Sequence, residues 1–290
     1  MQRNLAAVVM TLIGLTSEFT RATEPTHRDL EYAHAGDHRL LLDLYLPPQS
    51  EKPVPLVVWV HGGAWRAGSK DSMPVERWLQ QGFAIASVEY RLSPVAKVPA
   101  QIHDIKAAIR WLRGNAKTYA FDSDQFIIAG SSAGGHLAAL VGVSNGVVGL
   151  EGELGEFKST NSNVQAIVSF FGASNLESIL AQSRPHGLSV RVPALELLLG
   201  GQPDQKPELA RLASPVAHVD AADPPLWMIH GDADPQMPIE QSRELFQRFN
   251  DLKLKVDFEI VKGGKHGGEG FFTAAQLDRV ATEIKAAMNR

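Results

Sequence analysis

The sequence predicts an α/β protein with a doubly wound, mostly parallel β-sheet. Three observations support this prediction. Short apolar runs recur along the chain, as is typical of strands buried on both faces. Amphipathic helical patterns separate these runs, and the strand and helix patterns alternate. This alternation favours one domain for the 290 residues.

The first predicted element is an antiparallel β-hairpin at the edge of the sheet. Residues 30–35 and 38–45 alternate partially between polar and apolar side chains, and they flank the turn pair Gly36-Asp37. Six apolar runs then predict the remaining strands. They cover residues 56–60, 83–88, 126–129, 164–170, 226–229 and 256–261.

Helical spacing appears between and after these strands, with residues recurring at steps of three and four. The three clearest sets are Ile102, Ile105, Ile109 and Leu112; Ile239, Ser242, Phe246 and Phe249; and Leu277, Val280, Ile284 and Met288. In a doubly wound sheet, reactive groups lie on loops at the carboxyl ends of strands, near the point where the strand order reverses. Candidate site residues should therefore directly follow a predicted strand.

Residues 174–214 break the alternation. This segment contains four prolines, a Gly-Gly pair and only a short helical pattern at residues 194–199. One interpretation is a small cap inserted over one edge of the sheet, and the other is a long loop without secondary structure. Long loops of that kind are uncommon in compact domains.

Composition and charge exclude several classes of function. The chain has no cysteine, which excludes disulfides, thiolate metal sites and cysteine nucleophiles. The net charge is −4 and no long run of like charges occurs, so we expect no nucleic-acid partner. Asp232 and Asp234 lack the other ligands of a calcium loop, and no zinc-binding spacing is present. We expect neither a metal nor a cofactor.

Residues 1–22 have the layout of a secretory signal peptide. Arg3 precedes an apolar stretch at residues 5–15, and a small-residue cleavage pattern ends at Ala22. The stretch is too short to cross a bilayer as a helix. We therefore expect export to the periplasm or the outside of the cell and a mature domain over residues 23–290. The alternative is an ordinary helix packed on the domain.

The motif G-x-S-x-G at residues 130–134 identifies Ser132 as a candidate nucleophile. It lies between a predicted strand and a predicted helix, where a sharp turn can expose a serine hydroxyl. Glycines two residues to either side remove side chains that would collide across such a turn. Only Ser132 has glycine at both positions, because the corresponding neighbours of Ser131 are alanines.

A serine hydroxyl needs a base and the base needs an acid partner, which in this strand order should follow as acid and then histidine. His266 lies on a glycine-rich loop after the last predicted strand. Asp232 and Asp234 both follow the strand at residues 226–229. We favour Asp234, because Pro235 biases its backbone toward an extended turn that holds a carboxylate firmly.

Backbone amides for a negatively charged oxygen are expected after the strand at residues 56–60. Gly62 and Gly63, together with Ala133 behind the nucleophile, are the predicted donors, with Ala64 as a possible substitute. His61 is expected to brace this loop. Trp65 is a candidate substrate-binding residue that walls the cleft, although it can equally well pack within the protein.

Five segments together resemble the α/β-hydrolase esterases of the hormone-sensitive-lipase type, and within them the BD-FAE-like carbohydrate acetyl and feruloyl esterases. They are HGGAW at 61–65, EYRLS at 89–93, GSSAGGH at 130–136, HGDADPQMP at 230–238 and GGKHGG at 263–268. The resemblance extends over residues 29–288. It implies an α/β-hydrolase fold, a Ser132-Asp234-His266 triad and an oxyanion hole formed by Gly62, Gly63 and Ala133.

The resemblance also implies a scaffold role for Tyr90-Arg91 and Asp104, with an ion pair as one form. Asn175 is a departure, because relatives commonly carry aspartate there, and it affects the expected geometry of the cap. The sequence-based hypothesis is a serine carboxylic ester hydrolase acting on short-chain acyl, acetyl or feruloyl esters, including those of plant carbohydrates. Activity is expected to rise as the catalytic histidine loses its proton, near pH 6.5 if unperturbed.

Two alternatives compete with this hypothesis. The first is an arylformamidase, amidase or peptidase that uses the same triad. The second is a binding protein that keeps the pocket and has lost turnover. The presence of all three triad residues argues against the binding protein.

Overall fold

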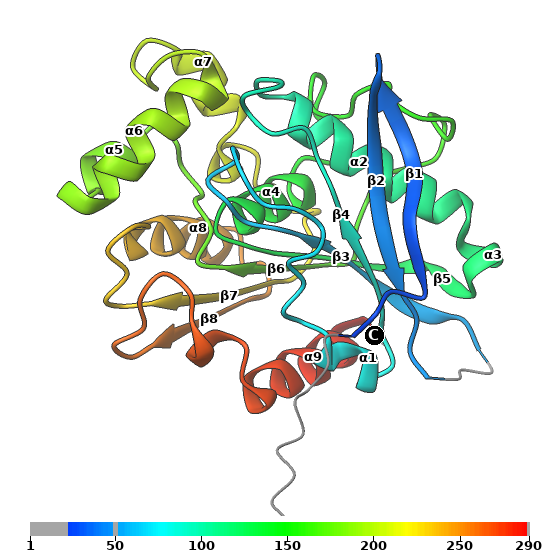
Figure 1. Cartoon of the computed structure of the whole chain (residues 1–290). Helices are drawn as coiled ribbons and strands as arrows, with labels where there is room; N and C mark the ends of the chain where they lie inside the picture. Colours follow the sequence, from blue (N-terminus) through cyan, green and yellow to red (C-terminus); the bar gives the residue numbers. More distant parts are fainter. Residues whose placement is uncertain (1–22, 49–51, 289–290) are drawn as a thin grey trace, which may run out of the picture.

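A computed structural model describes residues 23–48 and 52–288 of the chain. The expected signal peptide at residues 1–22 lies outside the described residues. An eight-stranded sheet with the order β1-β2-β4-β3-β5-β6-β7-β8 forms the centre of the protein (Figure 1). The strands are β1 His27–Ala35, β2 His38–Tyr45, β3 Val54–Val60, β4 Ala84–Val88, β5 Phe121–Ser131, β6 Ala166–Phe170, β7 Leu226–Gly231 and β8 Val256–Val261.

The sheet has the predicted directions. Strands β3 to β8 run parallel, whereas β1 pairs antiparallel with β2 and β2 pairs antiparallel with β4. The predicted mostly parallel sheet with an antiparallel N-terminal hairpin is therefore confirmed. The strand order reverses at β3, which lies between β4 and β5. This reversal places the loops that follow β3 and β5 next to each other.

Helices cover both faces of the sheet (Figure 1). Helices α2 (Ala100–Gly114), α4 (Ala133–Gly142) and α8 (Ile239–Asp251) share one core with one face. Helices α1 (Arg77–Gln80) and α9 (Ala274–Met288) share a second core with the other face. Alternate residues of β3 enter the two cores, Val58 and Val60 the first and Val57 and Trp59 the second. The remaining short elements are α3 Ala116–Tyr119, η1 Pro215–Ala217 and η2 Glu269–Phe271.

Strand β5 is longer than its apolar run predicted. It begins at Phe121, five residues before the predicted start, because pairing with β3 already begins there. The intervening residues are polar and partly solvent-exposed. Hydrophobicity therefore located the fully buried part of the strand and missed its first half.

The segment after β6 forms three helices, so the alternative of a long loop without secondary structure is wrong. They are α5 Ile179–Gln182, α6 Pro185–Leu199 and α7 Pro207–Leu212, which lie together at the upper left of Figure 1. Helix α6 extends well beyond the predicted residues 194–199. Pro185 and Pro207 occupy first-turn positions, where the missing N–H has no helical partner to lose.

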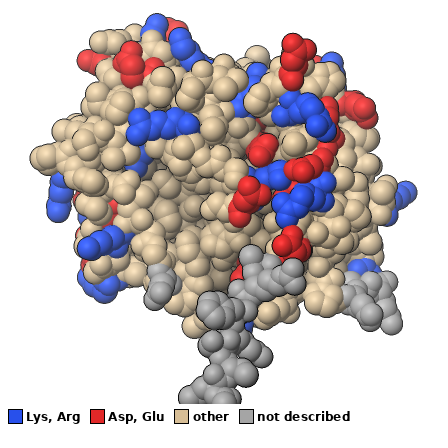
Figure 2. All heavy atoms as spheres, viewed as in Figure 1, with Lys and Arg blue, Asp and Glu red and all other residues tan. Residues whose placement is uncertain are grey.

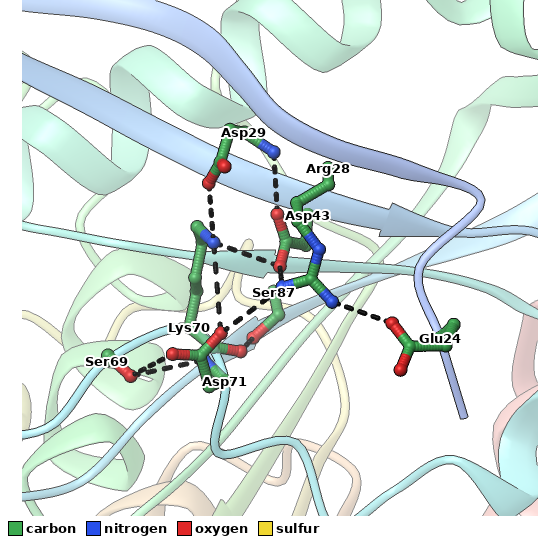
Figure 3. Close-up of polar contacts among 8 residues, drawn as sticks. All are labelled: Glu24, Arg28, Asp29, Asp43, Ser69, Lys70, Asp71 and Ser87. Carbon is green, nitrogen blue, oxygen red and sulfur yellow. Dashed lines mark hydrogen bonds and ion pairs between the residues drawn. The ribbon is translucent and has the colours of Figure 1, made fainter. Parts of the chain in front are cut away.

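A buried ion cluster ties the loop after β3 to the N-terminal hairpin. We call residues 61–72 the glycine loop. Lys70 of this loop has a side chain that is only 6% exposed, and its Nζ lies 2.8 Å from Asp29 and 3.0 Å from Asp43 (Figure 3). Ser87 of β4 donates a hydrogen bond to the Lys70 carbonyl. The glycine loop is thus held at both its main chain and its side chain.

Figure 2 shows the molecule from the same side as Figure 1. Acidic and basic side chains gather over the β1–β2 hairpin on this face, and uncharged residues surround a hollow near its centre. Within the described part of the chain, no helix is long and apolar enough to cross a membrane.

Candidate active site

Ser132 occupies a strained turn between β5 and α4. Its φ of 53° and ψ of −119° lie outside the regions that residues with a Cβ normally adopt. Such a conformation costs about 1–3 kcal/mol and persists only when the surroundings enforce it. Here the Ser132 amide donates to the Phe170 carbonyl at 2.8 Å. A Cβ at Gly134 would overlap the Val60 carbonyl, which explains the glycine on that side of the serine.

The structure brings Ser132, His266 and Asp234 into one hydrogen-bonded line. Ser132 Oγ lies 2.7 Å from His266 Nε2, and His266 Nδ1 lies 2.6 Å from Asp234 Oδ2. An ionised carboxylate only accepts hydrogen bonds, so the imidazole proton is placed on Nδ1. Nε2 is then free to accept the serine hydroxyl proton. The three residues follow β5, β8 and β7, at the carboxyl ends of these parallel strands.

Asp234 is held as a buried anion. Its side chain is fully buried, and its Oδ1 accepts the amides of Gln236 and Met237 at 2.8 and 2.9 Å. Burial by itself raises the pKa of Asp234, but hydrogen bonds from His230 and His266 outweigh burial and hold the pKa well below its ordinary value. The carboxylate therefore stays charged and orients the imidazole.

Asp232, the alternative acid, forms no ion pair with His266 and has other partners. It contacts Lys262 Nζ at 3.0 Å and accepts the Gly263 amide at 2.7 Å. The structure therefore favours Asp234 as the partner of His266.

His230 supports the acid and was not identified from the sequence. Its Nε2 lies 3.3 Å from Asp234 Oδ2, and its Nδ1 lies 2.8 Å from the Ser242 hydroxyl. The side chain is fully buried. The available signal was a histidine at the end of an apolar strand, four residues before the candidate aspartate.

The glycine loop forms one side of the cleft that contains Ser132. Gly62, Gly63 and Ala64 all line this cleft. Within residues 23–48 and 52–288, none of their amides donates to a backbone or side-chain acceptor. Gly63 has a φ of 112°, and Ala64 has a left-handed φ of 52° despite its Cβ. Ala133 is fully buried at the first position of α4, directly behind Ser132.

His61 and the Tyr90-Arg91 pair brace this loop. His61 stacks on Tyr90 with ring centroids 4.5 Å apart, and its Nδ1 lies 2.7 Å from the Gly62 carbonyl oxygen. Burial lowers the pKa of His61. The Tyr90 hydroxyl donates to the His61 carbonyl, and Arg91 forms an ion pair with the buried Asp104 at 2.6 Å. These contacts support the loop, and His61 itself also lines the cleft.

Trp65 requires a correction. The prediction that it contacts substrate is wrong, because the side chain is fully buried and does not line the cleft. Its Nε1 donates to His136 Nδ1 at 3.0 Å, and the two rings meet edge to face. Trp65 therefore packs beneath the site, as the second interpretation held.

Asn175, the departure from the expected pattern, serves the cap locally. Its side-chain oxygen accepts the Glu177 amide at 3.0 Å and its own amide donates to Gln241. It shapes the turn before α5 and makes no contact with the triad residues.

The cleft beside Ser132 has a volume of about 430 Å³. Ser132 and His266 lie on one side of it, and the cap contributes Arg191 from α6. Arg191 was not identified from the sequence, where it is a single charge within an apolar stretch. An open cleft lined by a paired serine and histidine and by free amides can perform nucleophilic acyl chemistry.

Comparisons of the sequence with known families and proteins agree on one family. The sequence profile of the BD-FAE family matches residues 42–249. Esterase LipC of Mycobacterium tuberculosis is 32% identical over 241 residues, a match that covers 81% of this chain and 58% of LipC. The chain spans about half the length of the curated relatives it matches.

Solved structures give a similar result. A truncated carbohydrate esterase from gut microbiota superposes with a TM-score of 0.82 at 34% identity, covering 91% of this chain and 96% of that protein. A bifunctional GH43-CE protein of Bacteroides eggerthii gives a TM-score of 0.81 at 33% identity, covering 90% of this chain and 35% of that protein.

Proposed function

The chain belongs to the BD-FAE family and has the α/β-hydrolase fold, and on that premise we propose that it is a serine carboxylic ester hydrolase. The observation that carries the proposal is the continuous line from Ser132 Oγ through His266 to Asp234. The esterases among its relatives and structural neighbours support the same reaction class.

In the proposed first step, Ser132 Oγ attacks the ester carbonyl carbon while its proton passes to His266 Nε2. Asp234 stabilises the imidazolium that forms. The tetrahedral intermediate then collapses, the carbon–oxygen bond to the alcohol breaks, and the alcohol leaves with the proton from His266. In the second step, water repeats this sequence on the acyl-enzyme and releases the carboxylic acid. His266 must be neutral to start each step.

The amides of Gly62, Gly63 and Ala133 are proposed to bind the negative oxygen of the intermediate. Free N–H groups beside the nucleophile can fulfil this role, because they are already oriented before charge develops. The strained backbone of Ala64 adds a further candidate, since strain in a residue with a Cβ tends to persist where function needs it. We therefore include the Ala64 amide in the proposed oxyanion hole.

For the substrate, we propose short-chain acyl esters, including acetyl or feruloyl esters of plant carbohydrates. The neighbour from gut microbiota is a carbohydrate esterase, and the chain matches only part of the bifunctional GH43-CE protein. A secreted or periplasmic location, expected from residues 1–22, fits such a substrate.

Replacing Ser132 with alanine tests the mechanism. Ser132→Ala should reduce kcat on nitrophenyl acetate by at least about 10⁴-fold, because the oxyanion hole and binding alone give only a small part of the rate. The variant should keep the unfolding midpoint of the parent within a few degrees, measured by circular dichroism. A fluorophosphonate probe should label the parent and leave Ser132→Ala unlabelled. Retention of most turnover by the variant would contradict the mechanism.

A substrate panel separates the proposed esterase from the arylformamidase. Nitrophenyl esters of increasing acyl length, feruloyl esters, acetylated xylan fragments and formyl-kynurenine should be compared by kcat/KM. The esterase predicts that an ester gives the highest value. A higher value for formyl-kynurenine would favour the alternative reaction.

A further inference from the structure

Arg191 is a buried cation without an anionic partner. Its side chain lies on α6 and is 1% exposed. Two of its three guanidinium nitrogens, Nε and Nη1, are buried and make no hydrogen bond. Within the described part of the chain, Arg191 forms no ion pair. Burial lowers the pKa of Arg191 to about 10, so the guanidinium remains charged near neutral pH.

The two buried lysines among the described residues, in contrast, have hydrogen-bonding or anionic partners. Lys70 contacts Asp29 and Asp43, and Lys106 contacts Glu151 at 2.5 Å and the Ser144 carbonyl at 2.7 Å. A buried charge without a partner is strongly unfavourable, and arginine cannot escape the penalty by losing its proton. The unmade hydrogen bonds of Arg191 therefore require an explanation.

The position of Arg191 supplies one. It lines the cleft that also contains Ser132 and His266. Its guanidinium carbon lies 5.8 Å from the centre of the Trp65 ring, so the indole supports it from within the protein. Helix α6 approaches the Asp234 loop so closely that a Cβ at Gly187 would lie 2.9 Å from the Gln236 carbonyl oxygen. These contacts fix the packed side of the guanidinium, and Arg191 borders the cleft.

The nearest negative charge is already engaged. Asp234 contacts His266, His230 and two backbone amides, and it forms no ion pair with Arg191. The side chain of Arg66, on the glycine loop, adds a second positive charge that acts on Arg191. The charge of Asp234 attracts Arg191, but no ion pair forms between them, so the guanidinium still lacks a carboxylate partner at the edge of the cleft.

We propose that Arg191 binds a carboxylate carried by the ester substrate, so that the site selects anionic esters over neutral ones. A guanidinium presents its donors in a planar fork that matches a carboxylate and can bind both oxygens. The inference rests on the proposed function, because the ester carbonyl must lie at Ser132 while the carboxylate lies at Arg191. The carboxylate is carried either by the acyl group, as in a half-ester of a dicarboxylic acid, or by the alcohol, as in an acetylated uronic acid.

Two matched substrate pairs distinguish these sources. Nitrophenyl hemisuccinate is compared with nitrophenyl butyrate for the acyl side, after subtraction of spontaneous hydrolysis. A mono-acetylated methyl glucuronoside is compared with the same ester of methyl glucoside for the alcohol side. The wild-type protein should favour the anionic member of one pair by about tenfold to a hundredfold in kcat/KM. The pair that shows the preference identifies the side that carries the carboxylate.

Arg191→Met should abolish this preference, because it should lower kcat/KM for the anionic member far more than for the neutral member. Arg191→Lys keeps the charge and should retain part of the preference. Arg211→Met, at an exposed arginine on α7 of the same cap, is the matched control and should retain all of it. The inference is overturned if the wild type prefers neither anionic ester. It is also overturned if Arg191→Met lowers kcat/KM for both members of a pair by the same factor.

A binding measurement separates this inference from the proposed function. Calorimetry of succinate and glucuronate with Ser132→Ala, and with Ser132→Ala combined with Arg191→Met, requires no turnover. If the wild-type protein hydrolyses no ester but the anions bind in a manner that depends on Arg191, the carboxylate site is retained and the esterase is rejected. Hydrolysis of neutral esters without carboxylate binding or preference would retain the esterase and reject this inference.

Discussion

Lys70 and Arg191 are both buried cations, yet their surroundings are opposite. Lys70 lies between the glycine loop and the hairpin, where two aspartates contact its ammonium group. Arg191 lies between the cap and the cleft, where two guanidinium nitrogens have no hydrogen-bond partner. A charge buried to join parts of a fold is satisfied by that fold. A charge left unsatisfied beside an open cleft is available to a ligand.

The two buried charges should also differ in their effect on stability. Lys70 should raise the free energy of unfolding, whereas Arg191 should leave it unchanged or lower it. Removing one partner of a buried pair leaves the other uncompensated, whereas removing a lone buried charge relieves a desolvation penalty. Asp43 is fully buried, and without Lys70 it would keep, among the described residues, only the more distant, half-exposed Arg28 as a positively charged partner. Arg191 leaves no such group behind.

The largest expected effect is therefore on Lys70. Lys70→Met should lower the free energy of unfolding by about 3 kcal/mol, and Arg191→Met should leave it unchanged or raise it by about 1 kcal/mol. Urea denaturation of both variants at pH 7 measures the difference. A loss of stability in Arg191→Met as large as that in Lys70→Met would show that Arg191 has a structural role, like Lys70.

A second effect emerges only as the pH is lowered. His136 is fully buried between the Trp65 indole and the Ala213 carbonyl, and burial lowers its pKa to about 4, with the charge of Arg191 also lowering it. In the unfolded chain the ordinary value is about 6.5. As pH falls from 6.5 to 4, the unfolded chain takes up a proton that the folded protein resists. Stability from this group is complete above pH 6.5 and is lost across that window, by roughly 3 kcal/mol in total.

The difference between the wild type and His136→Gln isolates this contribution from other acidic groups. The stability of the variant should fall less steeply between pH 6.5 and 4, as measured by urea denaturation at several pH values. Equal slopes for the two proteins would mean that His136 is not held neutral. Arg191→Met should raise the pKa of His136 in the folded protein and thereby narrow the pH range over which this stability is lost. Such a change would show that the charge of Arg191 acts on His136.

The smallest effect is expected at an exposed pair. Arg243 and Glu240 lie 2.9 Å apart on α8, with side chains 55% and 49% exposed. Arg243→Gln should change the free energy of unfolding by less than about 0.5 kcal/mol, because water and salt screen such a pair. A change as large as that of Lys70→Met would show that burial is not what separates these cations.

Much of this architecture could be predicted from the sequence because its signals are local. The apolar runs located the strands, and the glycines around Ser132 determined which of two adjacent serines occupies the turn. Pro235 separated Asp234 from Asp232, and the structure places Asp234 beside His266 as that reasoning expected. Each of these signals lies within a few residues of the feature that it predicts.

The features that were missed depend on distant contacts. Trp65 was a candidate for substrate binding because it follows the glycines, but His136 of α4 binds its indole inside the protein. Arg191 and His230 were not identified, because their importance depends on the cleft and on Asp234. Helix α6 was predicted too short, because its prolines suggested breaks and packing against the domain sustains the helix.

The wide separation of Ser132, Asp234 and His266 along the chain has a consequence for how this protein can be used. No contiguous fragment shorter than 135 residues contains all three residues, because Ser132 and His266 lie 134 positions apart in the sequence. Their hydrogen-bonded line also requires β5, β7 and β8 to be aligned with β6 between them. Labelling of Ser132 by a fluorophosphonate would thus serve as a gauge of complete folding, sensitive to any error in strand alignment on that half of the sheet.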